Sequence, residues 1–248
     1  MSEIETMSEG FVYTGRELEA MTEAANYHRW ILDIFKPYLG KHLVEVGAGL
    51  GSFSELILKN HDCETLSLVE PSEQMCERLV VLRNDLDTAT RVEAYHSTFL
   101  EAAPLIAQRQ MPDSIIYVNV LEHIADDEGE LNAICRSLSD GGHALIFVPA
   151  LPWLHGSLDD RVGHFRRYTK SEVERKLRRA GFKVLRSAYF DLPGIVPWWV
   201  MSRLLRSDTV GGGAISLYDR LVVPTLRRIE TLVPPPIGKN IIAVARKG

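Results

Sequence analysis

Cysteine is scarce in this 248-residue sequence, which contains only Cys63, Cys76 and Cys135. Their number is odd, they are widely spaced, and no two form a C-x-x-C pair. The pattern therefore indicates neither a disulfide framework nor a zinc site, and we expect these thiols to be buried or idle. Nothing else in the sequence requires a metal, so no metal ligands are predicted.

Long apolar runs and an excess of positive charge are also missing. No apolar run approaches the ~20 residues that span a bilayer. The N-terminus, with Glu3, Glu5 and Glu9, has neither the basic start nor the apolar stretch of a signal peptide, so we expect a cytoplasmic protein. The net charge of −5 argues against a broad nucleic-acid surface, and nucleic acid is not an expected partner.

The length and composition favour one α/β domain over residues 1–248. Residues 1–39 are expected to form a loose arm followed by a covering helix, because apolar residues recur at three- and four-residue steps between Glu17 and about Tyr38. Residues 40–150 are expected to form the cofactor-binding core. Residues 151–168 would then form a loop on the acceptor side, and residues 190–238 a helical insertion.

What the sequence does contain is a run of alternate glycines after a short apolar segment. Leu43–Val46 is followed by Gly47, Gly49 and Gly51, and a helical pattern resumes at Phe53. This order predicts a strand, a tight turn and a helix, with a nucleotide-like cofactor lying against the backbone at the helix N-terminus. The dinucleotide fingerprint requires a third glycine where this chain has Ser52, which counts against a nicotinamide oxidoreductase.

Strands alternate with helices along the predicted core. Further strands are expected at residues 65–69, 91–96, 114–118 and 143–148, and this alternation predicts a parallel, doubly wound sheet whose ligands bind at the carboxyl ends of the strands. Glu70 ends the second strand about twenty residues after the glycine turn, where a carboxylate can accept hydrogen bonds from both ribose hydroxyls.

Four features together resemble the class I S-adenosylmethionine-dependent methyltransferases. They are Glu45-x-Gly-x-Gly-x-Gly, Glu70, Asn119-Val-Leu-Glu-His after the fourth strand, and Gly141-Gly142 before the fifth. The resemblance covers roughly residues 40–150. It implies a Rossmann-like seven-stranded sheet and S-adenosylmethionine as the cofactor. The residue pattern adds an N-terminal helix and a helical insertion between the last two strands, where the family usually has a short hairpin.

The same resemblance implies which residues hold the cofactor. These are Glu45, Gly47, Ala48, Gly49, Gly51, Glu70, Pro71, Thr98, Asn119, Val120 and Leu121. The chain departs from the family after the third strand, because many relatives place an aspartate there to meet the adenine amino group, whereas this chain has Ser97-Thr98-Phe99. We therefore expect a hydroxyl or backbone groups to recognise adenine.

Residues 151–168 carry two histidines, two adjacent carboxylates and three arginines in a loop expected on the cofactor face. Such a cluster can position an acceptor, take its proton and bind an anionic group. We predict His155, His164 and Asp159 as catalytic residues, with His123 structural or near the cofactor. Predicted acceptor-binding residues are Tyr27, Arg166, Arg167, Tyr168 and Trp198. Alternatively, Arg166, Arg167 and Tyr168 lock the loop to the sheet.

The Gly-His-x-Arg-Arg-Tyr signature in this loop resembles a methyltransferase subgroup linked to glycan and lipid-carrier metabolism. Residues 190–238 separate the last two expected strands, 182–190 and 240–245, which is a long interruption for a compact domain. The insertion contains paired tryptophans, nearby arginines, three glycines and a helical pattern at about residues 215–232. It could be a lid, padding or a dimer contact, or an interfacial surface for a lipid.

The leading hypothesis is an S-adenosylmethionine-dependent methyltransferase that acts on a small or lipid-linked acceptor, at a hydroxyl. The alternatives are C- or N-methylation, a non-catalytic cofactor-binding module with a role in assembly or regulation, and a nicotinamide oxidoreductase. Peripheral contact with a membrane and a monomeric or homodimeric state are compatible with the sequence.

Overall fold

The computed structural model describes residues 24–85, 88–204 and 212–248. A seven-stranded sheet has the order β3-β2-β1-β4-β5-β7-β6. Its strands are β1 (His42–Val46), β2 (Thr65–Glu70), β3 (Arg91–His96), β4 (Ser114–Val118), β5 (His143–Pro149), β6 (Phe182–Phe190) and β7 (Asn240–Lys247). The first five are parallel, and β7 is antiparallel to β5 and β6. The predicted seven-stranded α/β sheet is confirmed.

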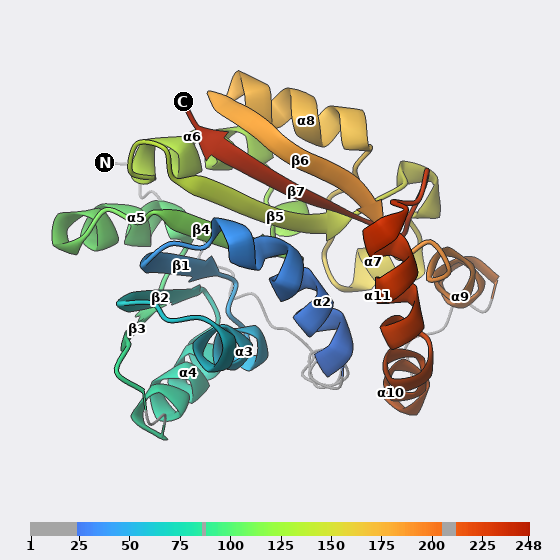
Figure 1. The fold of residues 1–248 in the computed structure, drawn as a ribbon, viewed down its shortest axis with the longest axis horizontal. Helices are drawn as coiled ribbons and strands as arrows, with labels where there is room; N and C mark the ends of the chain where they lie inside the picture. Colours follow the sequence, from blue (N-terminus) through green and yellow to red (C-terminus); the bar gives the residue numbers. More distant parts are fainter. Residues whose placement is uncertain (1–23, 86–87, 205–211) are drawn as a thin grey trace, which may run out of the picture.

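Helices cover both faces of this sheet (Figure 1). One core cluster contains residues from α5 (Phe99–Arg109), α6 (Asp127–Ser137) and α8 (Lys170–Arg179). The other contains residues from α2 (Ala25–Phe35), α3 (Ser52–Asn60), α4 (Glu73–Asp85) and α11 (Val223–Leu232). Successive side chains of a strand point to opposite faces of the sheet. In β5, Ile146 therefore packs in the first cluster and Phe147 in the second.

Two helices differ from the sequence-based expectations. α5 is not among the predicted helices, and Pro104 lies inside it. It begins with a capping box, in which the side chains of Thr98 and Glu101 each accept a hydrogen bond from the other residue's backbone N–H. This pattern is a sequence signal that could have identified the helix. The single helix expected at about residues 215–232 is two helices, α10 (Gly212–Leu221) and α11. The break occurs before Pro224, which cannot continue a preceding helix.

The acceptor-side loop is partly ordered into helical turns, a 3₁₀ turn at Pro152–Leu154 and the short α7 (Ser157–Arg161). The insertion contains α9 (Ile195–Trp199), a π-helical turn at Val200–Leu204, α10 and α11. These three helices gather at one end of the sheet (Figure 1). The predicted N-terminal arm, the start of the predicted first helix, and Arg206 and Gly211 of the insertion lie outside the described residues.

The insertion is fastened to the N-terminal helix by a carboxylate. Asp219 of α10 accepts hydrogen bonds from the backbone N–H groups of Asn26 and Tyr27, at 3.0 and 2.8 Å. These are N–H groups at the start of α2, which the helix itself cannot satisfy. Glu230 of α11 accepts from the N–H groups of Asp191 and Leu192, both at 2.9 Å. Asp219 thus ties α10 to the body of the domain, whereas Glu230 ties α11 to the first residues of the insertion, just after β6.

Within the described residues, no helix combines the length and apolar character needed to cross a membrane.

Candidate active site

A cavity of about 570 Å³ opens where the carboxyl ends of β1, β2 and β4 meet, as expected for a doubly wound sheet. It brings together most of the predicted site residues. Those that line it are Tyr27, Glu45, Gly47, Ala48, Gly49, Glu70, Pro71, Thr98, Asn119, Val120, His164, Arg167 and Trp198. Those that do not are Gly51, Leu121, His155, Asp159, Arg166 and Tyr168.

The glycine turn forms one wall of the cavity. Gly47 and Gly49 have φ values of 69° and 55°, in the left-handed region that favours glycine. A Cβ on Gly47 would lie 2.4 Å from Val120 Cγ2, so the turn can pass beside Val120 only without a side chain. Gly51, with φ of 82°, serves helix packing instead, because its Cβ would meet Leu82 of α4 at 2.4 Å. Gly51 does not line the cavity, so its predicted cofactor contact gains no support from its position.

Two buried carboxylates flank the turn. Glu70 is 3% exposed, and its two oxygens accept hydrogen bonds from the N–H groups of Gly49 and Ser72, each at 2.9 Å. Burial raises the pKa of Glu70, and these two hydrogen bonds offset only part of that rise. Glu45 is also buried and accepts from the Ser54 hydroxyl, and burial raises its pKa to about 8. Each oxygen of Glu70 keeps a second lone pair, so the carboxylate fits the role of a ribose acceptor.

The hydroxyl after the third strand is Ser97 rather than Thr98. The Thr98 hydroxyl donates to Glu101 Oε2 at 2.9 Å as part of the α5 capping box, so it is already engaged. The neighbouring Ser97 Oγ is buried, lines the cavity and has no hydrogen-bond partner among the described residues. An orphaned buried hydroxyl in a cavity wall suits a ligand that donates or accepts there. Thr98 was the predicted residue, and its capping role was visible in the Thr-x-x-Glu spacing.

The acceptor-side loop is built around Asp159, which is fully buried. Its Oδ1 accepts from Arg167 Nε at 2.8 Å and lies 2.7 Å from His164 Nδ1, and its Oδ2 accepts from the Gly156 N–H at 3.1 Å. Burial alone would raise the pKa of Asp159, but the His164 hydrogen bond and the Arg167 charge lower it overall. Asp159 therefore does not face an acceptor directly, and instead holds two side chains that do line the cavity.

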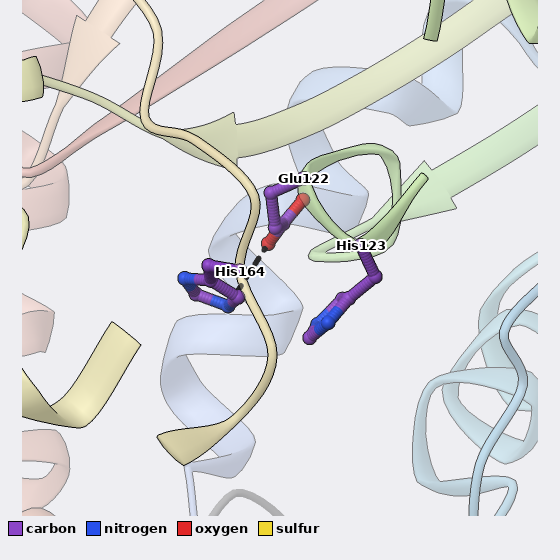
Figure 2. Close-up of side chains that lie close together, drawn as sticks. All are labelled: Glu122, His123 and His164. Atoms are coloured by element: carbon purple, nitrogen blue, oxygen red, sulfur yellow. Dashed lines mark ion pairs between the residues drawn. The ribbon is translucent and has the colours of Figure 1, made fainter. Parts of the chain in front are cut away.

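His164 is the histidine of this loop that reaches the cavity. Burial lowers its pKa against the opposing effect of Asp159, so the ring is neutral at neutral pH. In the neutral ring, Nδ1–H donates to the Asp159 carboxylate, which leaves the lone pair on Nε2. That nitrogen lies 3.8 Å from Glu122 Oε1 (Figure 2). Asp159 thus fixes both the tautomer and the orientation of a potential base.

His155 does not line the cavity, so its predicted catalytic role gains no support from the position of its ring. Its Nε2 contacts the His164 carbonyl oxygen at 3.3 Å, and its Nδ1 lies 3.6 Å from Asp160 Oδ1. The ring therefore braces the loop from behind the cavity wall. The short α7 turns the chain between the two histidines, so only the second reaches the interior side.

Arg166 and Tyr168, two of the predicted acceptor-binding residues, do not line the cavity, and their contacts anchor the loop. Tyr168 is fully buried, and its hydroxyl donates to Asp127 Oδ2 at 2.9 Å. Arg166 Nη1 pairs with the same oxygen at 2.9 Å, and its Nη2 donates to the Ala125 carbonyl at 2.7 Å. Arg167 differs, because it lines the cavity with its guanidinium 4.6 Å from the Trp198 ring centre. The alternative in which these residues lock the loop thus holds for two of the three.

Replacing Asp127 with alanine is expected to destabilise the fold by about 3–5 kcal/mol, because it leaves the buried Lys176 without its 2.8 Å partner. Burial would raise the pKa of Asp127, but Lys176, Arg166 and Tyr168 lower it overall. Its stabilisation is therefore present above the unfolded pKa of about 3.9 and is lost as pH falls through the folded value. Denaturant unfolding at pH 7 and pH 3 measures this. An equal cost at both pH values would contradict the assignment.

Several cavity residues were not identified from the sequence. Lys239 and Asn240 reach the cavity at the start of β7. Asn240 Oδ1 accepts from the Tyr27 hydroxyl at 3.1 Å, which links the first and last described elements of the chain. No local pattern marks these residues, because they adjoin the glycine turn only through the sheet topology. Glu122 stood inside a recognised motif without an assigned role, and it is fully buried.

Comparison with known proteins places this architecture. The family profile described as a methyltransferase domain matches residues 21–187. No curated protein matches the chain.

Among solved structures, the chain is similar to an S-adenosylmethionine-dependent methyltransferase from Archaeoglobus fulgidus, with 15% identity, coverage of 91% and 94% of the two chains, and a TM-score of 0.58. It is also similar to a chain in the structure of the complex between the Haloferax volcanii Trm112 methyltransferase activator and a methyltransferase. That comparison gives 14% identity, 94% coverage of both chains and a TM-score of 0.62. A cyclopropane synthase from Mycobacterium tuberculosis has 15% identity, coverage of 96% and 88%, and a TM-score of 0.56. At these identities the structural likeness shows the fold.

Proposed function

Because the chain belongs to the class I S-adenosylmethionine-dependent methyltransferases, we propose that it methylates a hydroxyl of a small or lipid-linked acceptor, with His164 as the general base. The observation that carries the proposal is the Asp159–His164 pair, which presents a neutral imidazole in the wall of the cavity formed by the glycine turn. A methyl acceptor bound there would meet a base that is already oriented.

The residues around the cavity fit the cofactor. Glu70 would accept the ribose hydroxyls, and the orphaned Ser97 hydroxyl would meet the adenine edge. Gly47 and Gly49 would lie under the methionine portion, where their left-handed backbone brings the turn against the cavity. When bound, S-adenosylmethionine supplies a methyl group on a positively charged sulfur, and the methyl passes to a nucleophile while sulfur keeps the bonding electron pair. Holding both partners in line supplies much of the rate of such a transfer.

The protein's own contribution is proton removal and shielding. His164 Nε2 would take the acceptor hydroxyl proton as the oxygen–carbon bond forms, and Asp159 would stabilise the resulting imidazolium through Nδ1–H. The Arg167 guanidinium, paired with Asp159, keeps the charge of the loop balanced. Trp198, stacked on Arg167, lines the same cavity and would help to shield the acceptor from water.

The helical insertion supports a lipid-linked acceptor. It exposes apolar side chains on each of its helices, including Val196 (65%), Trp199 (43%), Leu217 (59%) and Ile229 (56%). Trp198, the neighbour of Trp199, lines the cavity, so the same short helix joins the exposed apolar surface to the acceptor side. We therefore extend the proposal to a cytoplasmic enzyme with peripheral membrane contact. Assays of water-soluble and lipid-linked alcohols, with and without vesicles, would decide between these acceptors.

Replacing Gly49 with arginine is expected to raise the Kd for S-adenosylmethionine at least about 100-fold. A non-glycine residue at φ of 55° costs about 1–2 kcal/mol, and Gly49 lines the cavity with its N–H bonded to Glu70, so a large charged side chain would disturb both. Isothermal titration calorimetry measures the change. Gly213→Arg is the matched control, because its position on α10 has open space around the added Cβ.

Absence of any binding to the unmodified protein, or unchanged binding to Gly49→Arg, would overturn the cofactor site. Binding without methyl transfer to any acceptor in the panel would favour the non-catalytic module instead.

A further inference from the structure

Three potential ligands converge beside the cavity from two separate segments. Glu122 and His123 belong to the 3₁₀ turn Leu121–His123 that follows β4, and His164 belongs to the loop between α7 and α8. Figure 2 shows the three side chains facing a common space. One ligand atom from each lies within 4.8 Å of the other two. Both histidines also line the cavity, so this space adjoins the predicted acceptor site.

Glu122 lacks the partners that a buried carboxylate requires. It is 0% exposed, and neither of its oxygens has a hydrogen-bond partner among the described residues. His164 Nε2 lies 3.8 Å from Glu122 Oε1, which is too long for a hydrogen bond. The nearby Arg167 guanidinium is committed to Asp159 and to the Ala150 carbonyl. An unpartnered buried carboxylate is costly, so a cation or a proton must compensate it.

His164 is arranged as a metal-binding histidine would be. Its Nδ1 lies 2.7 Å from the Asp159 carboxylate, on the side of the ring away from Glu122. Metal-binding histidines commonly donate their other ring N–H to a carboxylate, which fixes the tautomer and strengthens the ligand. The Nε2 lone pair is therefore turned toward Glu122 and His123. This outer carboxylate is an observation independent of the cluster itself.

We propose that Glu122, His123 and His164 bind a divalent transition-metal cation of the Zn²⁺ type. Two imidazoles and a carboxylate are typical ligands of this class, whereas Mg²⁺ and Ca²⁺ prefer oxygen ligands alone. Three protein ligands leave a coordination position open toward the cavity, where an acceptor oxygen could bind. Zinc bonds of about 2.1 Å would set the ligand atoms roughly 3.0–3.4 Å apart, about 1.5 Å closer than the widest pair. Side-chain torsions and the His164 loop would have to supply that closure.

This inference goes beyond the proposed function and uses the same nitrogen. In the metal-free protein, His164 Nε2 is available as a base. In the metal-bound protein, that lone pair is engaged, and the ion itself would favour the ionised acceptor oxygen. Metal binding can be measured without methyl transfer, so failure of either proposal is distinguishable from failure of the other.

The test is titration of the full chain, without a histidine tag and after chelator treatment, with Zn²⁺ by calorimetry and with Co²⁺ by visible absorption. We expect one equivalent to bind, with a Co²⁺ ligand-field band, and no competition from Mg²⁺. Glu122→Gln and His123→Gln should each raise the Kd by more than about 100-fold, beyond the effect typical of outer ligands. Circular dichroism and thermal unfolding would verify that both variants fold.

His61→Gln is the matched control, because His61 follows α3, contacts the Gly40 carbonyl at 2.7 Å and does not line the cavity. Its Zn²⁺ affinity should equal that of the unmodified protein. Absence of saturable binding would overturn the proposal and leave a protonated Glu122 as the explanation of the buried carboxyl. Binding that survives in both Glu122→Gln and His123→Gln would place the ion elsewhere and would equally overturn it.

Discussion

Replacing His164 with glutamine is expected to lower kcat by roughly 10²–10⁴-fold, the range typical of losing a general base. Glutamine can still donate to Asp159, so the loop should keep its position, but it cannot take a proton from an acceptor. S-adenosylmethionine does not depend on this base for binding, and its Kd should remain within about threefold. Steady-state kinetics with a responsive acceptor, together with calorimetry of the cofactor, separate the two quantities.

His155→Gln is the comparison within the same loop. His155 contacts the His164 backbone but does not line the cavity, so its loss should change kcat far less. Equal activity losses in the two variants would indicate a shared role in loop folding. A loss confined to His155→Gln would contradict the assignment of the base. Because a lost metal ligand would also lower kcat, the Zn²⁺ titration decides which role of His164 a positive result reflects.

Replacing Glu70 with alanine is expected to raise the Kd for S-adenosylmethionine by roughly 10²–10⁴-fold. Two hydrogen bonds to a charged acceptor are worth about 1.5–3 kcal/mol each, and each 1.4 kcal/mol corresponds to a tenfold change. The carboxylate also accepts from the Gly49 N–H, so its loss releases the glycine turn that borders the cavity. Calorimetric titration of the folded variant measures the combined effect.

Glu77→Ala is the matched control, because Glu77 is exposed on α4 and carries the same charge. It should bind the cofactor as the unmodified protein does. Glu70→Gln retains one acceptor oxygen and should fall between the two. Unchanged affinity in Glu70→Ala, with an intact fold by circular dichroism, would remove Glu70 from the cofactor site.

The sequence predicted the sheet closely because its signals are local. The second, third and fourth strands and the sixth occur at or within one residue of their expected bounds, since each is an apolar run between clear breaks. The helix after Thr169 also has a local start signal, because the Thr169 hydroxyl accepts a hydrogen bond from the Glu172 N–H. α5 was not predicted, although its capping box is a local signal. The insertion helix was predicted without its break, although Pro224 marks that break.

The residues that gather around the cavity were predictable at the glycine turn and less so in the loop after β5. The glycine turn and Glu70 are ordered by consecutive elements of one unit, so their spacing in the chain reflects their spacing in the fold. Ser97 and Thr98 are adjacent, and the capping of α5 decides which hydroxyl is available. His155 and His164 were equivalent by residue type, and the turn of α7 separates them.

By itself, the sequence determined the α/β class, the position of the cofactor turn and the acidic residue that follows β2, because strand and turn chemistry act over a few neighbouring residues. Only the tertiary structure decided which side chains from distant parts of the sequence come into contact. Asp159 joins His164 to Arg167, and the turn after β4 brings Glu122 and His123 against His164. These contacts depend on how the loop packs over the sheet. The burial of Glu122 without a hydrogen-bond partner among the described residues can be recognised only once that packing is known.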